Sequence, residues 1–118
     1  MKAIFKNKLL AFDVDGTLLN TRGELTERTV NALTASTQAG AILTLATGRD
    51  WGTLGNLLDR LATVQYAVCT NGTEVYDREG ELIYARQIPV EIATELVITI
   101  RGQIDGAAIG AAIGREMI

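Results

Sequence analysis

Two aspartates one residue apart, Asp13 and Asp15, end an apolar stretch that begins at about residue 8. Carboxylates this close repel each other, and burying their charge is costly unless a positive group lies beside them. A metal ion is the simplest candidate for that group. A continuous apolar run is typical of a strand covered on both faces, and open α/β sheets bind ligands where such strands end. The pair is therefore predicted to lie at the carboxyl end of a central strand.

Three apolar runs supply the strands that would position these side chains. They span residues 8–14, 41–46 and 66–69. A segment that begins with a good helix N-cap, Thr26, and ends at Gly40 joins the first two, so a helix of about 13 residues is expected between them. The order strand, helix, strand predicts an α/β fold with a Rossmann-like parallel sheet and right-handed crossovers.

The rest of the chain contains further helix and turn signals. Asn71 and Gly72 make a turn, and residues 74–77 and 81–84 are predicted to form a β-hairpin. Pro89 suits the first turn of a following helix. Beyond that helix glycine recurs every four residues, and a loop leading into a strand at about residues 107–113 is expected, because glycines weaken a helix.

Four residues near the second crossover have structural interpretations. The helix there begins after either Asp50 or Thr53, since both are good N-cap residues. Trp51 is expected to pack rather than to bind a substrate. Cys69 lies in the third apolar run and is expected to be an unreactive core residue.

The composition narrows the class of protein. The chain has 118 residues, about one domain, and its 47% hydrophobic content is ordinary for a folded protein. A net charge of −3 gives no reason to expect a nucleic acid or an anionic membrane as a partner. The lack of histidine excludes Ser-His-Asp and Cys-His catalytic units, and a single cysteine excludes an intrachain disulfide. With no secretory segment and no run of the ~18–20 apolar residues that span a membrane, a cytoplasmic protein is expected.

Three motifs carry a resemblance to a known family. The segment FDVDGTLLN resembles the first motif (DxDGT) of the haloacid dehalogenase superfamily of phosphotransferases. The segment LTLATGR resembles the second motif, in which an apolar strand ends in a phosphate-binding Thr. The segment TNGT resembles the Asn-Gly turn of the subfamily with a large α/β cap, called Cof-type. The motifs occur in the family's order and spacing, and the resemblance runs from about residue 8 to about residue 100.

This resemblance implies roles for the residues after the first strand. Asp13 would be the nucleophile that attacks phosphorus, and Asp15 would be the general acid and base. Asp13 and the backbone carbonyl of Asp15 would hold Mg²⁺, a cation that prefers oxygen ligands. Gly16 would allow the tight exit from the strand, and Thr17 would form a hydrogen bond within the loop. Both would belong to the phosphate- or substrate-binding residues.

The resemblance also implies phosphate- or substrate-binding residues after the other two strands. Thr47 would offer its hydroxyl and its backbone N–H to phosphate oxygens, next to Gly48 and Arg49. The alternatives are an ordinary strand-to-helix turn for this segment and a structural ion pair for Arg49. Asn71 would contact the substrate or its phosphate, and its alternative is a simple turn residue.

A calcium loop is a second kind of metal site that the spacing of the first motif could fit. Asp13, Asp15, Thr17 and Glu24 fall at positions 1, 3, 5 and 12 of an EF-hand loop. Leu18 stands where that loop needs glycine, and a strand rather than a helix precedes it. An EF-hand is therefore not favoured.

By this resemblance, residues 1–86 are the N-terminal part of a phosphatase core, and residues 87–118 are a linker helix and the start of a cap domain. The family's downstream Lys and acidic metal-binding motifs do not occur in the chain, so a truncated chain is expected. The implied function is a Mg²⁺-dependent phosphatase for small phosphorylated metabolites such as sugar phosphates, acting through an aspartyl-phosphate. One alternative is a non-catalytic scaffold fragment that self-associates through unpaired sheet edges. The other is a phosphomutase of the same superfamily.

Overall fold

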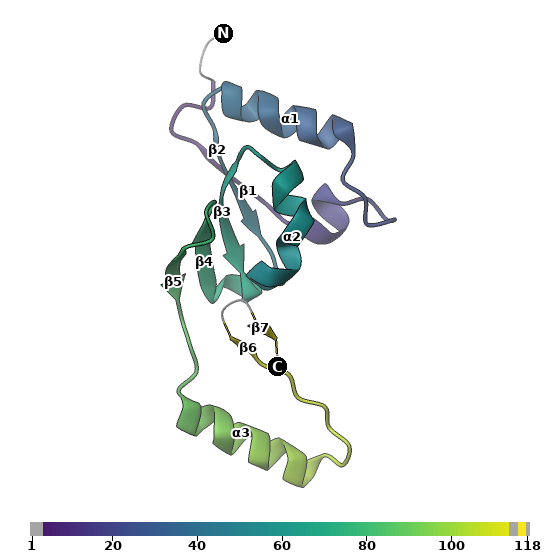
Figure 1. Cartoon of the computed structure of the whole chain (residues 1–118), viewed down its shortest axis with the longest axis vertical. Coiled ribbons are helices and arrows are strands. Elements are labelled where there is room, and N and C mark those ends of the chain that lie inside the picture. Colours follow the sequence, from purple (N-terminus) through teal and green to yellow (C-terminus); the bar gives the residue numbers. More distant parts are fainter. Residues whose placement is uncertain (1–3, 114–115, 118) are drawn as a thin grey trace.

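The computed structural model describes residues 4–113 and 116–117, and these contain a five-stranded sheet, a two-stranded ribbon and three α-helices (Figure 1). The strands of the sheet are β1 (Leu9–Phe12), β2 (Ile42–Ala46), β3 (Val64–Cys69), β4 (Glu74–Asp77) and β5 (Leu82–Ala85). The helices are α1 (Glu27–Gln38), α2 (Trp51–Arg60) and α3 (Val90–Gln103). The ribbon pairs β6 (Ala112–Ile113) with β7 (Glu116–Met117).

Local capping sets where α1 and α2 begin. The hydroxyl of Thr26 accepts a hydrogen bond from the backbone N–H of Thr29, which confirms Thr26 as the N-cap of α1. The carboxylate of Asp50 accepts from the backbone N–H of Thr53 at 3.0 Å. Asp50 is therefore the N-cap of α2, and of the two predicted alternatives Thr53 is excluded. Gly40 follows α1 with a φ of 97°, a left-handed conformation that glycine adopts without strain.

The sheet is parallel across β1, β2 and β3, as the sequence predicts. In this register Phe12 lies beside Leu45, and Leu45 lies beside Ala67. The side chains of these strands that face α1 and α2 join the helices in one hydrophobic core. Its buried members are Val14, Leu18, Leu19, Leu25, Leu33, Ala41, Leu43, Leu45, Leu54, Leu61, Val64, Ala67, Cys69 and Tyr76.

The other face of the sheet is uncovered, and this corrects one expectation. β1 was expected to be a central strand covered on both faces, but it is the edge strand in the order β1-β2-β3-β4-β5. Leu9, Ile42 and Tyr66 share the open face and are 63%, 41% and 42% exposed. In the described part of the chain, no strand pairs with the free edge of β1 and no helix covers this face.

The second half of the sheet is a hairpin, so the whole sheet is mixed rather than parallel. β4 runs antiparallel to β3 and to β5, which confirms the predicted hairpin with its second strand at Leu82–Ala85 instead of residues 81–84. Arg78, in the connection, donates to the backbone oxygens of Leu61 and Val64.

Helix α3 lies apart from the sheet (Figure 1). Pro89 is the N-cap of α3, one residue before the first turn in which it was predicted, and no residue of α3 is buried. Figure 1 shows α3 at the opposite end of the molecule from α1, and the longest dimension is 61 Å. The strand expected at about residues 107–113 begins only at Ala112, and Gly114 of the glycine series lies outside the described residues. None of the helices in the described chain has the length and apolar character that crossing a membrane requires.

The position of the core predicts which leucines and isoleucines matter for stability. Leu45 is fully buried, so Leu45→Ala leaves a cavity and is expected to lower the free energy of unfolding by about 2–5 kcal/mol. The matched control is Ile98→Ala on α3, where the side chain is 67% exposed, and its effect is expected to stay within about 0.5 kcal/mol. Urea denaturation followed by circular dichroism measures both. Equal destabilisation by the two variants would contradict this assignment of the core.

Candidate active site

A single tight turn after β1 carries both aspartates. The backbone N–H groups of Leu18 and Leu19 donate to the carbonyls of Asp13 and Val14, and Gly16 within the turn has a φ of 75°. Only glycine adopts that conformation readily, which agrees with its predicted role at the exit of the strand. The turn buries the apolar side chains of Val14 and Leu18 and leaves its polar side chains exposed.

The exposed side chains of the turn interact locally. The hydroxyl of Thr17 donates to Oδ2 of Asp13 at 2.9 Å, which confirms the predicted bond within the loop. This bond fixes one oxygen of the Asp13 carboxylate. The other oxygen is free of hydrogen bonds to the described residues.

Asp15 is held by an arginine from the next loop. Arg49 donates from Nε to Oδ2 at 2.9 Å and from Nη2 to Oδ1 at 2.6 Å, so both oxygens of the Asp15 carboxylate are occupied. The hydrogen bonds from Arg49 lower the pKa of Asp15; burial opposes this shift, and the charge of Arg49 adds a smaller lowering effect. The same contact raises the pKa of Arg49. The structure thus gives Arg49 an ion-pair partner, and its predicted contact with phosphate stays a prediction.

Thr47 follows the last residue of β2, and its backbone N–H is not available for phosphate as expected. Its backbone N–H donates to the carbonyl of Val68 at 2.9 Å, so this group belongs to the sheet. The expectation that this backbone N–H binds phosphate is therefore wrong. The hydroxyl oxygen of Thr47 accepts from the backbone N–H of Arg49 at 3.1 Å. A hydroxyl that accepts can still donate its proton, so this group keeps a donor for a phosphate oxygen.

Backbone hydrogen bonds join the loop after β2 to the loop after β3. The N–H of Thr70 donates to the carbonyl of Arg49 at 2.9 Å, and that of Asn71 donates to the carbonyl of Thr47 at 3.1 Å. The side chain of Asn71 lies over Gly48, because a Cβ atom at position 48 would be 3.0 Å from Oδ1 of Asn71. Gly48 therefore makes room for the Asn71 side chain.

These loops line a small, open cavity at the carboxyl ends of the parallel strands. Its volume is about 380 Å³, and Asp13, Thr47, Gly48 and Asn71 line it together. Four residues that the sequence predicted for one site are thus brought together. Asp15, with its partner from the β2 loop, does not line this cavity.

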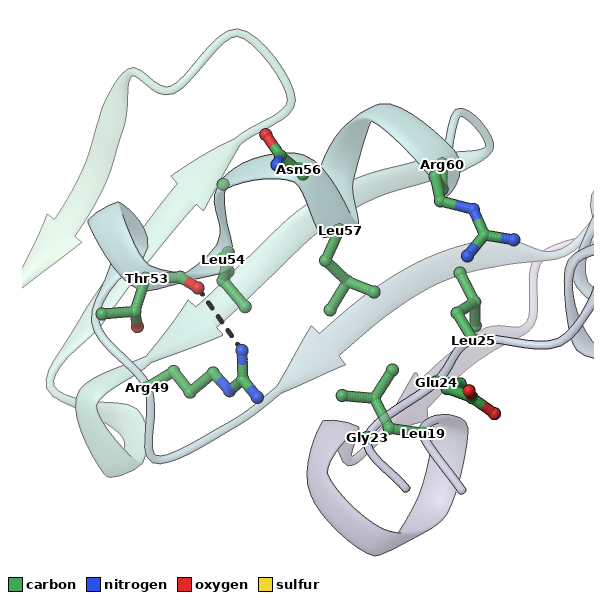
Figure 2. Close-up of a pocket in the computed structure, with 11 residues that line it drawn as sticks. Leu19, Gly23, Glu24, Leu25, Arg49, Thr53, Leu54, Asn56, Leu57 and Arg60 are labelled. Carbon is green, nitrogen blue, oxygen red and sulfur yellow. Dashed lines mark hydrogen bonds between the residues drawn. The ribbon is translucent and has the colours of Figure 1, made fainter. Parts of the chain in front are cut away.

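A larger cavity of about 640 Å³ lies between α2 and the segment after the first turn. Figure 2 shows Arg49 pointing from the end of β2 into this space, where Nη1 donates to the carbonyl of Thr53 at 3.4 Å. Arg60 lines the far side and pairs with Glu27 at 2.9 Å. The larger cavity contains neither of the two aspartates of the first motif, so the smaller one is the better candidate for chemistry.

The calcium-loop alternative does not fit the structure. Glu24, which that alternative required as a ligand, pairs with Arg22 at 2.9 Å and accepts from the side chain of Asn20. Within the described residues, no three His, Cys, Asp or Glu side chains come together as a metal site would need. Of the two aspartates after β1, Asp13 is therefore the one whose carboxylate is open to a metal, since Arg49 occupies the carboxylate of Asp15.

The aromatic, cysteine and glutamate side chains near the site are buried or half-buried. Trp51 stacks on Tyr76 with ring centroids 4.8 Å apart, which confirms its packing role. Cys69 is fully buried, and burial raises the pKa of its thiol to about 12, with smaller contributions from the charges of Glu74 and Asp50. Glu74 is buried on β4 beside this site, and sequence reasoning missed it, since its only signal was alternation with Tyr76.

Comparison with protein families gives one match that covers most of the chain. A family model described as haloacid dehalogenase-like hydrolase matches residues 10–109. Among curated proteins, the HMP-PP phosphatases of Shigella flexneri serotype 5b and Escherichia coli K12 are similar to this chain. Each is 38% identical over 91 residues, which is 77% of this chain and 33% of the relative. The chain thus spans about a third of the length of the curated relatives it matches.

Solved structures with the same arrangement come from the same family. A haloacid dehalogenase-like hydrolase from Bacillus subtilis superposes with a TM-score of 0.72 at 27% identity, covering 81% of this chain and 34% of that one. A haloacid dehalogenase-like hydrolase from Bacteroides thetaiotaomicron gives 0.70 at 30% identity, covering 82% and 38%. A HAD subclass IIB sugar phosphatase gives 0.68 at 30% identity with the same coverage.

The contact between Gly48 and Asn71 gives a prediction for ligand binding. In Gly48→Ala the new methyl group must displace the Asn71 side chain, so affinity for inorganic phosphate is expected to fall about tenfold, or ~1.4 kcal/mol. Titration followed by ¹H–¹⁵N NMR measures the affinity and the shift of the Asn71 side-chain amide. Gly102→Ala is the matched control, because a Cβ atom there has no neighbour within 4 Å. An unmoved Asn71 amide in a folded Gly48→Ala protein would contradict the contact.

Proposed function

The chain belongs to the haloacid dehalogenase-like hydrolase family, and on that premise we propose that it carries the N-terminal part of a Mg²⁺-dependent phosphatase for small phosphorylated metabolites. The observation that carries the proposal is the shared cavity at the ends of the parallel strands. Asp13, Thr47 and Asn71 line this cavity together, and their side chains offer a carboxylate, a hydroxyl and an amide. A nucleophile beside two neutral hydrogen-bonding groups suits a phosphoryl group better than it suits a free cation.

The proposed reaction begins at Asp13. Its carboxylate oxygen attacks phosphorus in line, the bond from phosphorus to the leaving oxygen breaks, and an aspartyl-phosphate forms. Water then attacks the same phosphorus and the bond to Asp13 breaks, which releases inorganic phosphate. The Thr17 hydroxyl, bound to Oδ2, leaves Oδ1 of Asp13 as the attacking oxygen.

Asp15 transfers protons in this scheme, and Arg49 controls its charge. The two hydrogen bonds from Arg49 hold Asp15 as the anion, which is the form that takes a proton from the attacking water. To protonate the leaving oxygen in the first step, Asp15 must carry a proton, and this requires that Arg49 release it. A substrate phosphate would compete for the guanidinium, since arginine binds phosphate and carboxylate with the same geometry.

The donor set after β1 suits Mg²⁺, although it is incomplete. Asp13 and the backbone carbonyl of Asp15 offer the hard oxygen ligands that this cation prefers. When bound, Mg²⁺ would neutralise charge between the nucleophile and the phosphate. Mg²⁺ usually keeps several waters and phosphate oxygens as ligands, so few protein donors are needed.

The relatives suggest the class of substrate. HMP-PP phosphatases and a sugar phosphatase are similar to this chain, so we assign it small phosphorylated metabolites such as sugar phosphates. Residues 1–86 are then the start of the catalytic core, and residues 87–118 are the linker helix and the start of the cap. A phosphomutase would share the first half of the reaction and differ only in the acceptor, so it stays an alternative.

Removal of the nucleophile tests the proposed reaction. Release of phosphate from a generic aryl phosphate is expected to require Mg²⁺ and to fall by at least about 10³-fold in Asp13→Asn, since the amide cannot form the covalent intermediate. Asp59→Asn is the matched control, because Asp59 is an exposed aspartate on α2 away from the cavity. An unchanged rate of phosphate release in Asp13→Asn, or after a chelator has removed Mg²⁺, would refute the mechanism.

The open sheet face supports a second function, a scaffold that self-associates. Exposed Leu9, Ile42 and Tyr66 beside the free edge of β1 form a surface of the kind that pairs with another chain. Sedimentation analysis is expected to show a concentration-dependent dimer, and Leu9→Lys, which puts a charge on this face, is expected to shift it to monomer. Ile98→Lys on α3 is the control. A wild-type chain that sediments as a monomer at all concentrations would count against this function.

A further inference from the structure

The loop that carries Asn71 has a strained backbone. Thr70, Asn71 and Gly72 have successive φ angles of 49°, 54° and 96°. Glycine adopts such values freely and asparagine tolerates them, but a β-branched threonine in this region is an outlier. Such a conformation persists only where the surrounding structure fixes it from several sides, and such strain is typical of functional sites.

Backbone hydrogen bonds fix one side of this loop. The N–H groups of Thr70 and Asn71 donate to the carbonyls of Arg49 and Thr47 in the loop after β2. These bonds set the distance between the two loops. They do not hold the Thr70 side chain, whose orientation decides how the strained residue is packed.

A buried carboxylate lies on the other side of the loop. Glu74, the first residue of β4, is 5% exposed, and its Oε2 accepts from the hydroxyl of Tyr76 at 3.1 Å and from that of Thr70 at 3.5 Å. Tyr76 is itself fixed by its stack on Trp51. Glu74 is thereby tied to the rigid sheet on one side and to the strained loop on the other.

Glu74 has no counter-charge in the part of the chain that the structure describes. The ion pairs found there join Arg22 to Glu24, Arg49 to Asp15 and Arg60 to Glu27. A carboxylate buried with only hydroxyl donors is costly, and an apolar side chain would fill the same space without that cost. A carboxylate at this position is explained if its hydrogen bonds hold neighbouring groups in place, which an apolar side chain cannot do.

We propose that Glu74 is a positioning residue, which through Thr70 holds the strained turn so that Asn71 lies at the cavity shared by Asp13 and Thr47. Glu74 does not line this cavity, so it is not expected to touch a phosphate bound there. Its effect on ligand binding rests on the proposed function, whereas its effect on the conformation of the turn does not.

Two variants of Glu74 separate positioning from simple packing. Glu74→Ala removes both hydrogen bonds, whereas Glu74→Gln keeps the shape and one acceptor oxygen and should restore most of the wild-type behaviour. Glu79→Ala in the exposed connection between β4 and β5 is the matched control. Glu74→Ala takes the Glu74 acceptor away from the hydroxyls of Thr70 and Tyr76, so it is expected to lower the stability of the fold as well. Thr70→Val, which keeps the branched shape and leaves Glu74 in place, is the second variant.

The first measurement is made on the turn itself. Amide hydrogen exchange of Asn71, whose N–H donates to Thr47, is expected to speed up about tenfold in Glu74→Ala and in Thr70→Val, but little in Glu74→Gln. The backbone coupling constants of Thr70 and Asn71 should change in the same two variants. Unchanged exchange and couplings in folded Glu74→Ala and Thr70→Val proteins would overturn the proposal.

The second measurement adds inorganic phosphate as the probe. Its dissociation constant is expected to rise about tenfold in Glu74→Ala and by less than about threefold in Glu74→Gln, a rescue that loss of stability alone would not give. If the wild-type chain binds no phosphate, the proposed function fails, and the exchange experiment still decides the role of Glu74. A wild-type phosphate affinity in Glu74→Ala, with a disturbed turn, would overturn the link from the turn to the site.

Discussion

The parallel pairing of β2 with β1 on one side and with β3 on the other is the constraint on which the site depends. Because Phe12 lies beside Leu45, and Leu45 beside Ala67, the three strands end at the same edge of the sheet. Asp13, Thr47 and the Asn71 turn each follow one of these strands. The packing of α1 and α2 on the buried face stabilises that register, since a slip by one residue would turn the leucines outward.

Polar groups at this edge are arranged in two layers. The exposed layer pairs Asp15 with Arg49 and Asp13 with Thr17, and solvent screening makes such contacts worth little to stability. Their value lies in orienting carboxylates and in setting the charge of Asp15. The layer beneath is buried, and there Glu74 is satisfied by hydroxyl groups rather than by a cation. Reactive groups can therefore stay accessible while the loops that carry them are fixed from below.

Local signals in the sequence were enough for much of this fold. Thr26 caps α1 because its hydroxyl reaches a backbone N–H three residues later, and such short-range chemistry can be read without a structure. The same holds for the hairpin after Asn71 and for the start of α3 after Pro89. Whether both faces of β1 are covered could not be predicted from such local signals. The apolar run indicates that burial of β1 is favourable, but which other elements pack against this strand decides whether both of its faces are buried.

The sequence by itself determined the residue types, their order along the chain and the family to which their motifs belong. Only the tertiary structure decided which polar groups remain free to bind a ligand. The N–H of Thr47 is used by Val68, and the partner of Arg49 is 34 residues away in the sequence. The burial of Glu74 likewise follows from the position of β4 between two strands. Hydrogen bonds between distant segments depend on strand register and packing, which a local pattern of residues does not specify.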